Sequence, residues 1–175
     1  LRDLSRALFP VEASHAVDEA YTETWARIVN VIYCAQGAPA PEQSRAMREM
    51  LGVERMFASA QGAKILEHQG TNNTCVRDTH AGGGSGFAED TNVLSYYVLA
   101  GALINDMNGF LRWCAAYAPG YLRFPSRPKA VRSFGELLVR AVRRERFAEA
   151  MSSVSGWPGR QITDAKKYLG STLRM

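Results

Sequence analysis

The least polar stretch of the chain runs from Asp90 to Tyr117. No charged residue occurs between Asp90 and Asp106, and most of these positions are apolar or aromatic. A helix that is apolar nearly all round lies buried, and a bilayer span needs about 20 apolar residues, which is more than this run contains. The pattern therefore predicts that residues 91–117 form the buried central helix of the fold, with Gly109 as a candidate position for a break.

Helical periodicity precedes this stretch. An amphipathic helix is predicted over 14–36, because apolar residues recur at steps of four, four, three and four, and Gly37 is typical of its end. Gly52 is expected to close a second helix over 41–51, and a third follows over 53–66 with Gly62 at a kink or a close crossing. The residues that carry the first periodicity are Val17, Tyr21, Trp25, Ile28 and Ile32.

The last third alternates between turns and amphipathic segments. Three prolines favour an extended path over 118–130, and the capping-box pattern of Ser133 and Glu136 predicts a helix over 133–150. Arginines occupy one side of that helix together with Phe147, while Glu145 falls among the apolar residues, so the helix bends there or the carboxylate is paired. A short helix is expected over 161–169, and no sustained strand pattern occurs.

These patterns predict an all-α protein, a single compact domain over 1–175 with about five to seven helices around 91–117. Residues 1–12 are a candidate N-terminal arm, and 152–175 a C-terminal extension. Residues 70–89 lack periodicity and are expected to form a flexible loop or linker. The run Gly82 to Gly86 also has the composition of an engineered linker, and that alternative stays open.

Composition suits a folded protein in a reducing setting. The 175 residues are 46% hydrophobic, enough for a real core in one domain. Three widely spaced cysteines do not make a disulfide framework, so Cys34 and Cys114 are expected to be small core residues. No secretory signal pattern opens the sequence. A cytoplasmic or virion location, with neither secretion nor membrane insertion, is the expectation.

Charge is divided unevenly along the chain. Residues 112–175 carry 13 Lys and Arg against 4 Asp and Glu, whereas residues 1–111 carry 8 against 13. Such asymmetry suggests a polyanionic partner, or association of the acidic part of one subunit with the basic part of another.

The basic third is the main candidate site. Arginine stays charged and donates two hydrogen bonds at once to a phosphate, and interleaved aromatic rings can stack on unpaired bases. The alternatives are a solvated face paired with acids of the same chain and a protein–protein contact; no nucleic-acid module signature occurs. The candidate nucleic-acid-binding residues are Arg112, Tyr121, Arg123, Phe124, Arg127, Lys129, Arg132, Arg140, Arg143, Arg144 and Arg146.

Three residues are expected to act structurally. Asp106 lies in the most apolar stretch, and buried carboxylates are usually paired, here with Arg27 or with an arginine from 112 onward. The alternative is that Asp106 lies at a bend and faces water. Trp25 and Trp113 are expected in the core.

The sequence gives little support for a catalytic site or a metal site. The set His68, Cys75, Asp78 and His80 has the residue types of a zinc site but no common spacing. Cys75 with either histidine is the only local nucleophile pair, and it lacks a family signature. The glycines at 82–86 lack the ending of a phosphate-binding loop. We predict no catalytic residue, no metal and no cofactor.

Two functional hypotheses follow. The first is a non-enzymatic nucleocapsid or coat subunit, of viral type, that binds single-stranded RNA phosphates without sequence preference and forms homo-oligomers. The second is a helical protein–protein interaction module, an adaptor or regulatory subunit, whose basic helix docks on an acidic partner.

Overall fold

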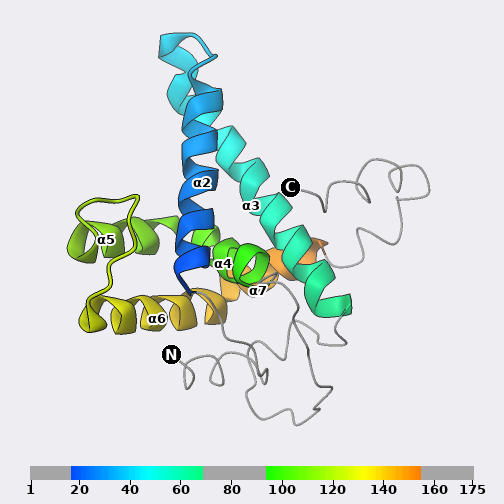
Figure 1. Ribbon diagram of the computed structural model, residues 1–175. Helices are drawn as coiled ribbons and strands as arrows, with labels where there is room; N and C mark the ends of the chain where they lie inside the picture. Colours follow the sequence, from blue (N-terminus) through cyan, green and yellow to red (C-terminus); the bar gives the residue numbers. More distant parts are fainter. Residues whose placement is uncertain (1–16, 69–93, 155–175) are drawn as a thin grey trace.

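The computed structural model describes residues 17–68 and 94–154, and these residues are almost entirely helical (Figure 1). No strand occurs among them, so the all-α prediction is confirmed. The α-helices are α2 (Val17–Ala35), α3 (Gln43–His68), α4 (Ala100–Asn105), α5 (Met107–Tyr117), α6 (Pro128–Arg143) and α7 (Glu145–Val154). A 3₁₀ turn, η1 (Ala40–Glu42), precedes α3, and a π-helical turn, η2 (Leu94–Leu99), precedes α4.

Several predicted segments lie outside the described residues. They are the arm at 1–12, the N-cap at Ser14, the loop 70–89, the part of the C-terminal extension after residue 154, and the helix at 161–169.

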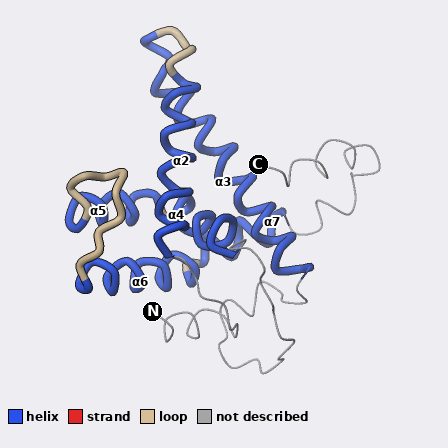
Figure 2. The backbone as a smooth tube through the Cα atoms, in the orientation of Figure 1, coloured by secondary structure: helices blue, strands red, loops and turns tan. Residues whose placement is uncertain are grey.

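The helices form a body from which one hairpin projects. α2 and α3 run side by side in opposite directions, and the half of the pair next to η1 extends beyond the other helices (Figure 1). α6 and α7 lie at the opposite end, and α5 packs on α6. The longer loops within the described residues are the hairpin tip and the α5–α6 connection (Figure 2). The projecting part of the hairpin therefore has fewer neighbours than the body.

The centre of the body is α4. All six of its residues are buried, and it contacts each of the other described α-helices. The prediction of a buried centre within 91–117 is thus confirmed, but the stretch is not one continuous helix. It breaks at Asp106, whose backbone leaves the helical region at φ −106° and ψ 43°. The break comes three residues before Gly109, because the Asp106 side chain caps the next helix.

The two helices predicted at 41–51 and 53–66 are one helix, α3, of 26 residues. A glycine inside a helix costs only about 1 kcal/mol relative to alanine, and packing against α2 outweighs that cost. Gly62 lies where α3 meets η2 and α7: a Cβ there would be 3.8 Å from Val98 and Met151. On α4, a Cβ at Gly101 would lie 3.5 Å from Ala58, so α3 and α4 approach closely at that point.

The helix predicted over 133–150 is two helices with different ends. α6 begins at Pro128, five residues before the predicted cap, because proline suits the first turn of a helix. It ends at Arg143, and Arg144 is extended with ψ 133°. Glu145 then opens α7, where a carboxylate is favoured by the helix dipole. Phe147 is 1% exposed rather than beside the arginines, since a new helix resets which residues face inward.

On α2 the predicted apolar face is only partly buried. Val17, Tyr21 and Ile28 are in the core, whereas Ile32 is 41% exposed because the hairpin projects past the body. For the same reason Cys34 is exposed, which contradicts its prediction as a core residue, while Cys114 is buried.

Candidate nucleic-acid interface

The exposed face of α6 carries a row of basic side chains. Lys129, Arg132, Arg140 and Arg143, with Glu136 between them, follow at steps of three or four residues, which places them on one side of the helix. We call these five residues the α6 stripe. Its length is about 21 Å at 1.5 Å per residue. The opposite side is buried through Phe134, Leu138 and Val142, so packing of the core determines that the stripe faces outward.

The stripe retains positive charge. Among the ion pairs of the described residues, none joins Lys129, Arg132 or Arg140 to a carboxylate. Glu136 lies four residues from Arg132 and from Arg140, yet it forms no ion pair with either. The alternative in which these cations are neutralised by acids of the described chain therefore does not hold for Lys129, Arg132 and Arg140.

Arg144 behaves differently from the stripe. Its Nη1 lies 2.9 Å from Asp106 Oδ1, and the exposed fractions of the two side chains are 52% and 5%. Asp106 also accepts a hydrogen bond from the Gly109 backbone N–H at 3.3 Å, as the N-cap of α5. Asp106 is thus both at a bend and paired with an arginine, but it does not face water. Arg144 joins α6 to the α4–α5 junction and is not a free phosphate contact.

Glycine is needed at position 109 for this cap. A Cβ there would overlap the Asp106 carboxyl group and lie 2.7 Å from its Cγ. The carboxylate can therefore reach the backbone N–H only because residue 109 has no side chain. The Asp106…Gly109 spacing, an acid three residues before the N–H it caps, is the sequence signal that could have located the start of α5.

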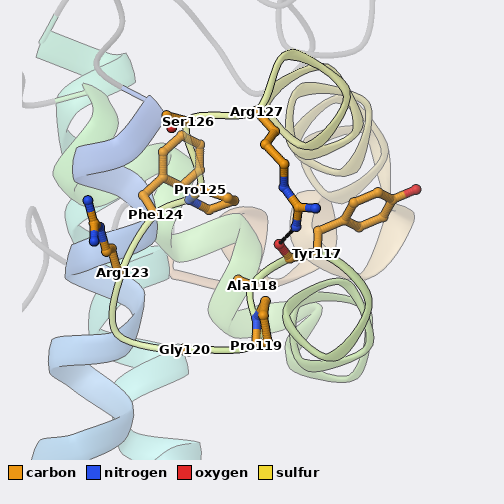
Figure 3. Close-up of a pocket in the computed structure, with 9 residues that line it drawn as sticks. All are labelled: Tyr117, Ala118, Pro119, Gly120, Arg123, Phe124, Pro125, Ser126 and Arg127. Carbon is orange, nitrogen blue, oxygen red and sulfur yellow. Dashed lines mark hydrogen bonds between the residues drawn. The ribbon is translucent and has the colours of Figure 1, made fainter.

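The α5–α6 loop, residues 118–127, forms a nearly closed ring. Arg127 Nη2 donates to the carbonyl oxygen of Tyr117 at 3.3 Å and joins the two ends of the loop (Figure 3). On the side facing α2, the Tyr21 hydroxyl donates to the carbonyl oxygen of Tyr121. Tyr121 has φ +50°, the left-handed region that non-glycine residues adopt rarely. Contacts at both sides hold the loop in one shape.

A surface pocket of about 280 Å³ lies within this ring. Its cations are Arg123 and Arg127, and Figure 3 shows their guanidinium groups on opposite sides of the loop. Cations set apart in this way do not converge on one small anion, but each can contact a separate phosphate of a path that continues toward α6. The lining residues are Tyr117, Ala118, Pro119, Gly120, Arg123, Phe124, Pro125, Ser126 and Arg127.

The aromatic residues of the region mostly contact one another. Trp113 stacks on Tyr117 and on Phe124, with ring planes 25° and 18° apart. Phe124 also meets Tyr21 and Phe134 edge-on, so it is half-buried and anchors the loop. These three rings cover part of Phe124, and the remaining part lines the loop pocket.

Trp25 and Tyr121 complete this aromatic cluster. The Tyr121 ring meets Trp25 edge-on at 5.8 Å and remains 45% exposed. Trp113 is buried and Trp25 is partly buried against the core, so both tryptophans lie where a structural role places them.

The remaining predicted cations lie apart from the stripe. Arg112 is exposed on α5. Arg146, near the start of α7, lies close enough to Arg55 to affect it: burial, and then the charge of Arg146, lower the pKa of Arg55. Arg55 itself donates to the carbonyl oxygen of Ile104 at 3.1 Å, near the carboxyl end of α4, where a cation is favoured. The predicted cations thus divide into those of the α6 stripe, the pair Arg123 and Arg127 in the α5–α6 loop, and these separate arginines.

The metal site and the nucleophile pair considered from the sequence are not located in the residues that the structure describes. Within 17–68 and 94–154, no group of three or more His, Cys, Asp and Glu side chains could hold a metal ion. Cys75, Asp78 and His80 lie outside those ranges, and His68 is the last residue of α3. No helix of the described part is long and apolar enough to cross a bilayer.

Comparison with protein-family models, with curated proteins and with solved structures gives no match for this chain.

Proposed function

We propose that this chain is a structural subunit of nucleocapsid or coat type, which binds single-stranded RNA along α6 and assembles with copies of itself. The observation that carries the proposal is the α6 stripe, in which Lys129, Arg132 and Arg140 are exposed and have no carboxylate partner in the described chain. Cations in a row suit a polyanion with a regular charge repeat better than a small ligand.

The geometry favours contact with the RNA backbone. Neighbouring positions of the stripe are about 5–6 Å apart on the helix surface, and the long side chains can each reach a separate phosphate. Phosphates are the same at every nucleotide, so such contacts give affinity without sequence preference. Arg127, the residue before α6, extends the basic row into the α5–α6 loop.

Single-stranded RNA is favoured over a duplex by the tyrosines beside this row. Tyr117 lines the loop pocket, and Tyr121 is partly exposed on the same loop. An unpaired base can stack on a tyrosine ring, which a paired base inside a duplex cannot do. The protein would then act in the cytoplasm or in a virion, as a viral structural protein without catalytic activity or cofactor.

The proposal is tested by removing two charges from the stripe. Arg132→Gln with Arg140→Gln should weaken binding of a labelled 12-nucleotide RNA at least about 10-fold, and should lower the slope of log affinity against log salt by about 1.4. Fluorescence anisotropy over a salt series measures both quantities.

A matched control changes the same charge elsewhere. Arg45→Gln with Arg48→Gln removes two exposed arginines from the projecting hairpin, and it should change affinity less than about twofold. Equal losses in both double variants, or no binding by the unaltered chain at low salt, would contradict RNA binding along α6.

A helical adaptor or regulatory subunit is the second candidate. It is favoured by exposed apolar side chains on the hairpin, such as Tyr33 at 76% and Val53 at 59% exposed. In that case the α6 stripe docks on an acidic protein surface, and an acidic polypeptide rather than RNA should protect α6 from hydrogen exchange.

A further inference from the structure

Exposed apolar side chains gather along one side of α2. Nine large hydrophobic residues are exposed in the described chain, and five of them, together with the partly buried Trp25, form a contiguous row. We call this row the α2 stripe; its members are Trp25, Val29, Ile32 and Tyr33 of α2 and Tyr121 and Leu122 of the α5–α6 loop. Tyr33 and Leu122 are 76% and 70% exposed, so most of their surface is open to a partner.

The row is continuous from the loop to the hairpin tip. On α2, Trp25, Val29 and Tyr33 follow at steps of four, one above another on the helix surface. At the body end, the Tyr121 ring lies 5.8 Å from Trp25, and Leu122 follows Tyr121 directly. At the other end, the hairpin extends beyond the body (Figure 1), so a partner can approach this part of α2 without meeting the other helices.

Charge is absent from this side of the hairpin helix. Arg27 is the only charged residue of α2 after Glu23, and its side chain is directed elsewhere. It pairs with Glu23 at 2.9 Å and with Glu54 of α3 at 3.4 Å, and it is 8% exposed. A partner that covers the α2 part of the stripe is therefore expected to be apolar itself.

The α2 row is nearly symmetric about Val29. Trp25 and Tyr33 lie four residues to either side of it, and the exposed polar residues Thr22 and Gln36 lie seven residues to either side. When two such rows pack antiparallel, Val29 meets Val29, each Trp25 meets the Tyr33 of the other copy, and Thr22 meets Gln36. An interface that is complementary to itself in this way has a two-fold axis.

We propose that the α2 stripe is the contact between two copies of this chain, packed antiparallel with the two-fold axis at Val29. The exposed parts of its side chains present on the order of 500 Å² of apolar surface, a large patch for a monomer. A stable interface buries about 800 Å² on each partner, and the polar residues beside the row supply the rim. The proposed contact depends on the proposed function in one respect only. It names the surface through which two subunits of the proposed assembly first pair.

The dimer is tested by a charge placed on the two-fold axis. In Val29→Glu, the new carboxylate of each copy lies against the new carboxylate of the other copy, and no cation is there to pair with either. The dissociation constant in sedimentation equilibrium without RNA should rise at least about 100-fold. The matched control Val53→Glu, at an exposed apolar position of α3, should change it less than about threefold. A monomeric unaltered chain at 100 µM, or the same mass for Val29→Glu as for the unaltered chain, overturns the proposal.

A second variant locates the axis. In a Cys34→Ser, Cys75→Ser background, Val29→Cys should form a disulfide between two copies under mild oxidation, and Val53→Cys should not. Equal cross-linking of the two overturns the antiparallel arrangement. RNA affinity of Val29→Glu is measured on an RNA too short for two subunits and should stay within about twofold of the unaltered value. The mass is measured without RNA. A chain that does not dimerise is therefore distinguished from a chain that does not bind RNA.

Discussion

Asp106 joins three parts of the structure through one carboxylate. It ends α4, caps the first turn of α5 through the Gly109 N–H, and pairs with Arg144 after α6. A buried carboxylate needs hydrogen-bond donors to offset its lost hydration, and the half-exposed Arg144 and the Gly109 N–H both donate to Oδ1. The side chain thereby determines where two helices meet and how α6 lies against them.

Gly109→Ala should destabilise the protein by roughly 1–3 kcal/mol. The added methyl group displaces the Asp106 carboxylate, which loses its cap and weakens the pair with Arg144. Losing a cap costs about 0.5–2 kcal/mol and losing a buried pair more, while the better helix propensity of alanine returns up to about 1 kcal/mol. Urea denaturation followed by circular dichroism measures the difference. Unchanged or increased stability would mean that the Asp106 cap contributes little.

The hydroxyl of Tyr21 is buried where α2 meets the α5–α6 loop. Burial raises the pKa of Tyr21 to about 12, mainly because the phenolate loses its hydration. Burial likewise raises the pKa of the Cys114 thiol to about 11. Both groups keep their protons in the folded state at pH values where they lose them in the unfolded chain.

Alkaline pH should therefore destabilise the protein through Tyr21. Because its pKa is raised on folding, the associated stability is present below about pH 10 and is lost as the pH rises through about 12, by roughly 2–3 kcal/mol in all. Tyr21→Phe should remove that part of the pH dependence and cost about 0.5–1.5 kcal/mol at neutral pH, through loss of the bond to the Tyr121 carbonyl. Denaturation from pH 8 to 12 tests this against Tyr33→Phe at an exposed tyrosine. Equal pH dependence of both variants would contradict it.

Among the elements, α3 depends most on its surroundings. It continues through Gly52 and Gly62 because its lower half is enclosed by α4, α7 and η2 and its upper half packs on α2. Intrinsic helix propensity therefore affects the course of α3 only where no neighbouring element packs against the residue. At Gly52 an added Cβ would meet nothing within 4 Å.

Gly52→Ala should stabilise the protein by about 0.5–1 kcal/mol. The substitution restricts the unfolded chain and improves helix propensity without any steric cost in the folded state. Gly62→Ala is the matched comparison: it makes the same change of propensity, and its methyl group makes ordinary van der Waals contact with Val98 and Met151 at 3.8 Å, so it should stabilise the protein at least as much. Thermal unfolding of both variants checks the difference, and a loss of stability in Gly52→Ala would indicate a break in α3 at that position.

At the scale of the molecule, the two exposed surfaces lie on different helices, and the α5–α6 loop lies between them with residues that belong to each. The α6 stripe is basic and lies on the body, whereas the α2 stripe is apolar and extends along the projecting hairpin (Figure 1). RNA binding and pairing of copies are thus expected to respond to different substitutions. A subunit with both surfaces could place the α6 stripes of two copies on one strand, which raises the effective concentration of the second contact.

The candidate site was predictable only in part. The spacing of Arg140 and Arg143 already assigns them to one side of a helix, whereas Lys129 and Arg132 were expected before the start of that helix and join the stripe because α6 begins at Pro128. The pairing of Arg144 with Asp106 and the closure of the loop by Arg127 join residues 38 and 10 positions apart. Which arginine is withdrawn from the stripe depends on where α6 ends, and periodicity alone does not locate that end.

By itself, the sequence determined the all-α class, the burial of the stretch around Leu103 and the basic character of α6, since each follows from local periodicity and composition. Only the tertiary structure decided that Gly52 continues a helix, that Asp106 ends one, that Phe147 is covered and Phe124 partly covered, and that Ile32 and Tyr33 are exposed. The reason is physical: an apolar residue is buried only if another element lies over it, and whether α2 extends past its neighbours is a property of the assembled helices.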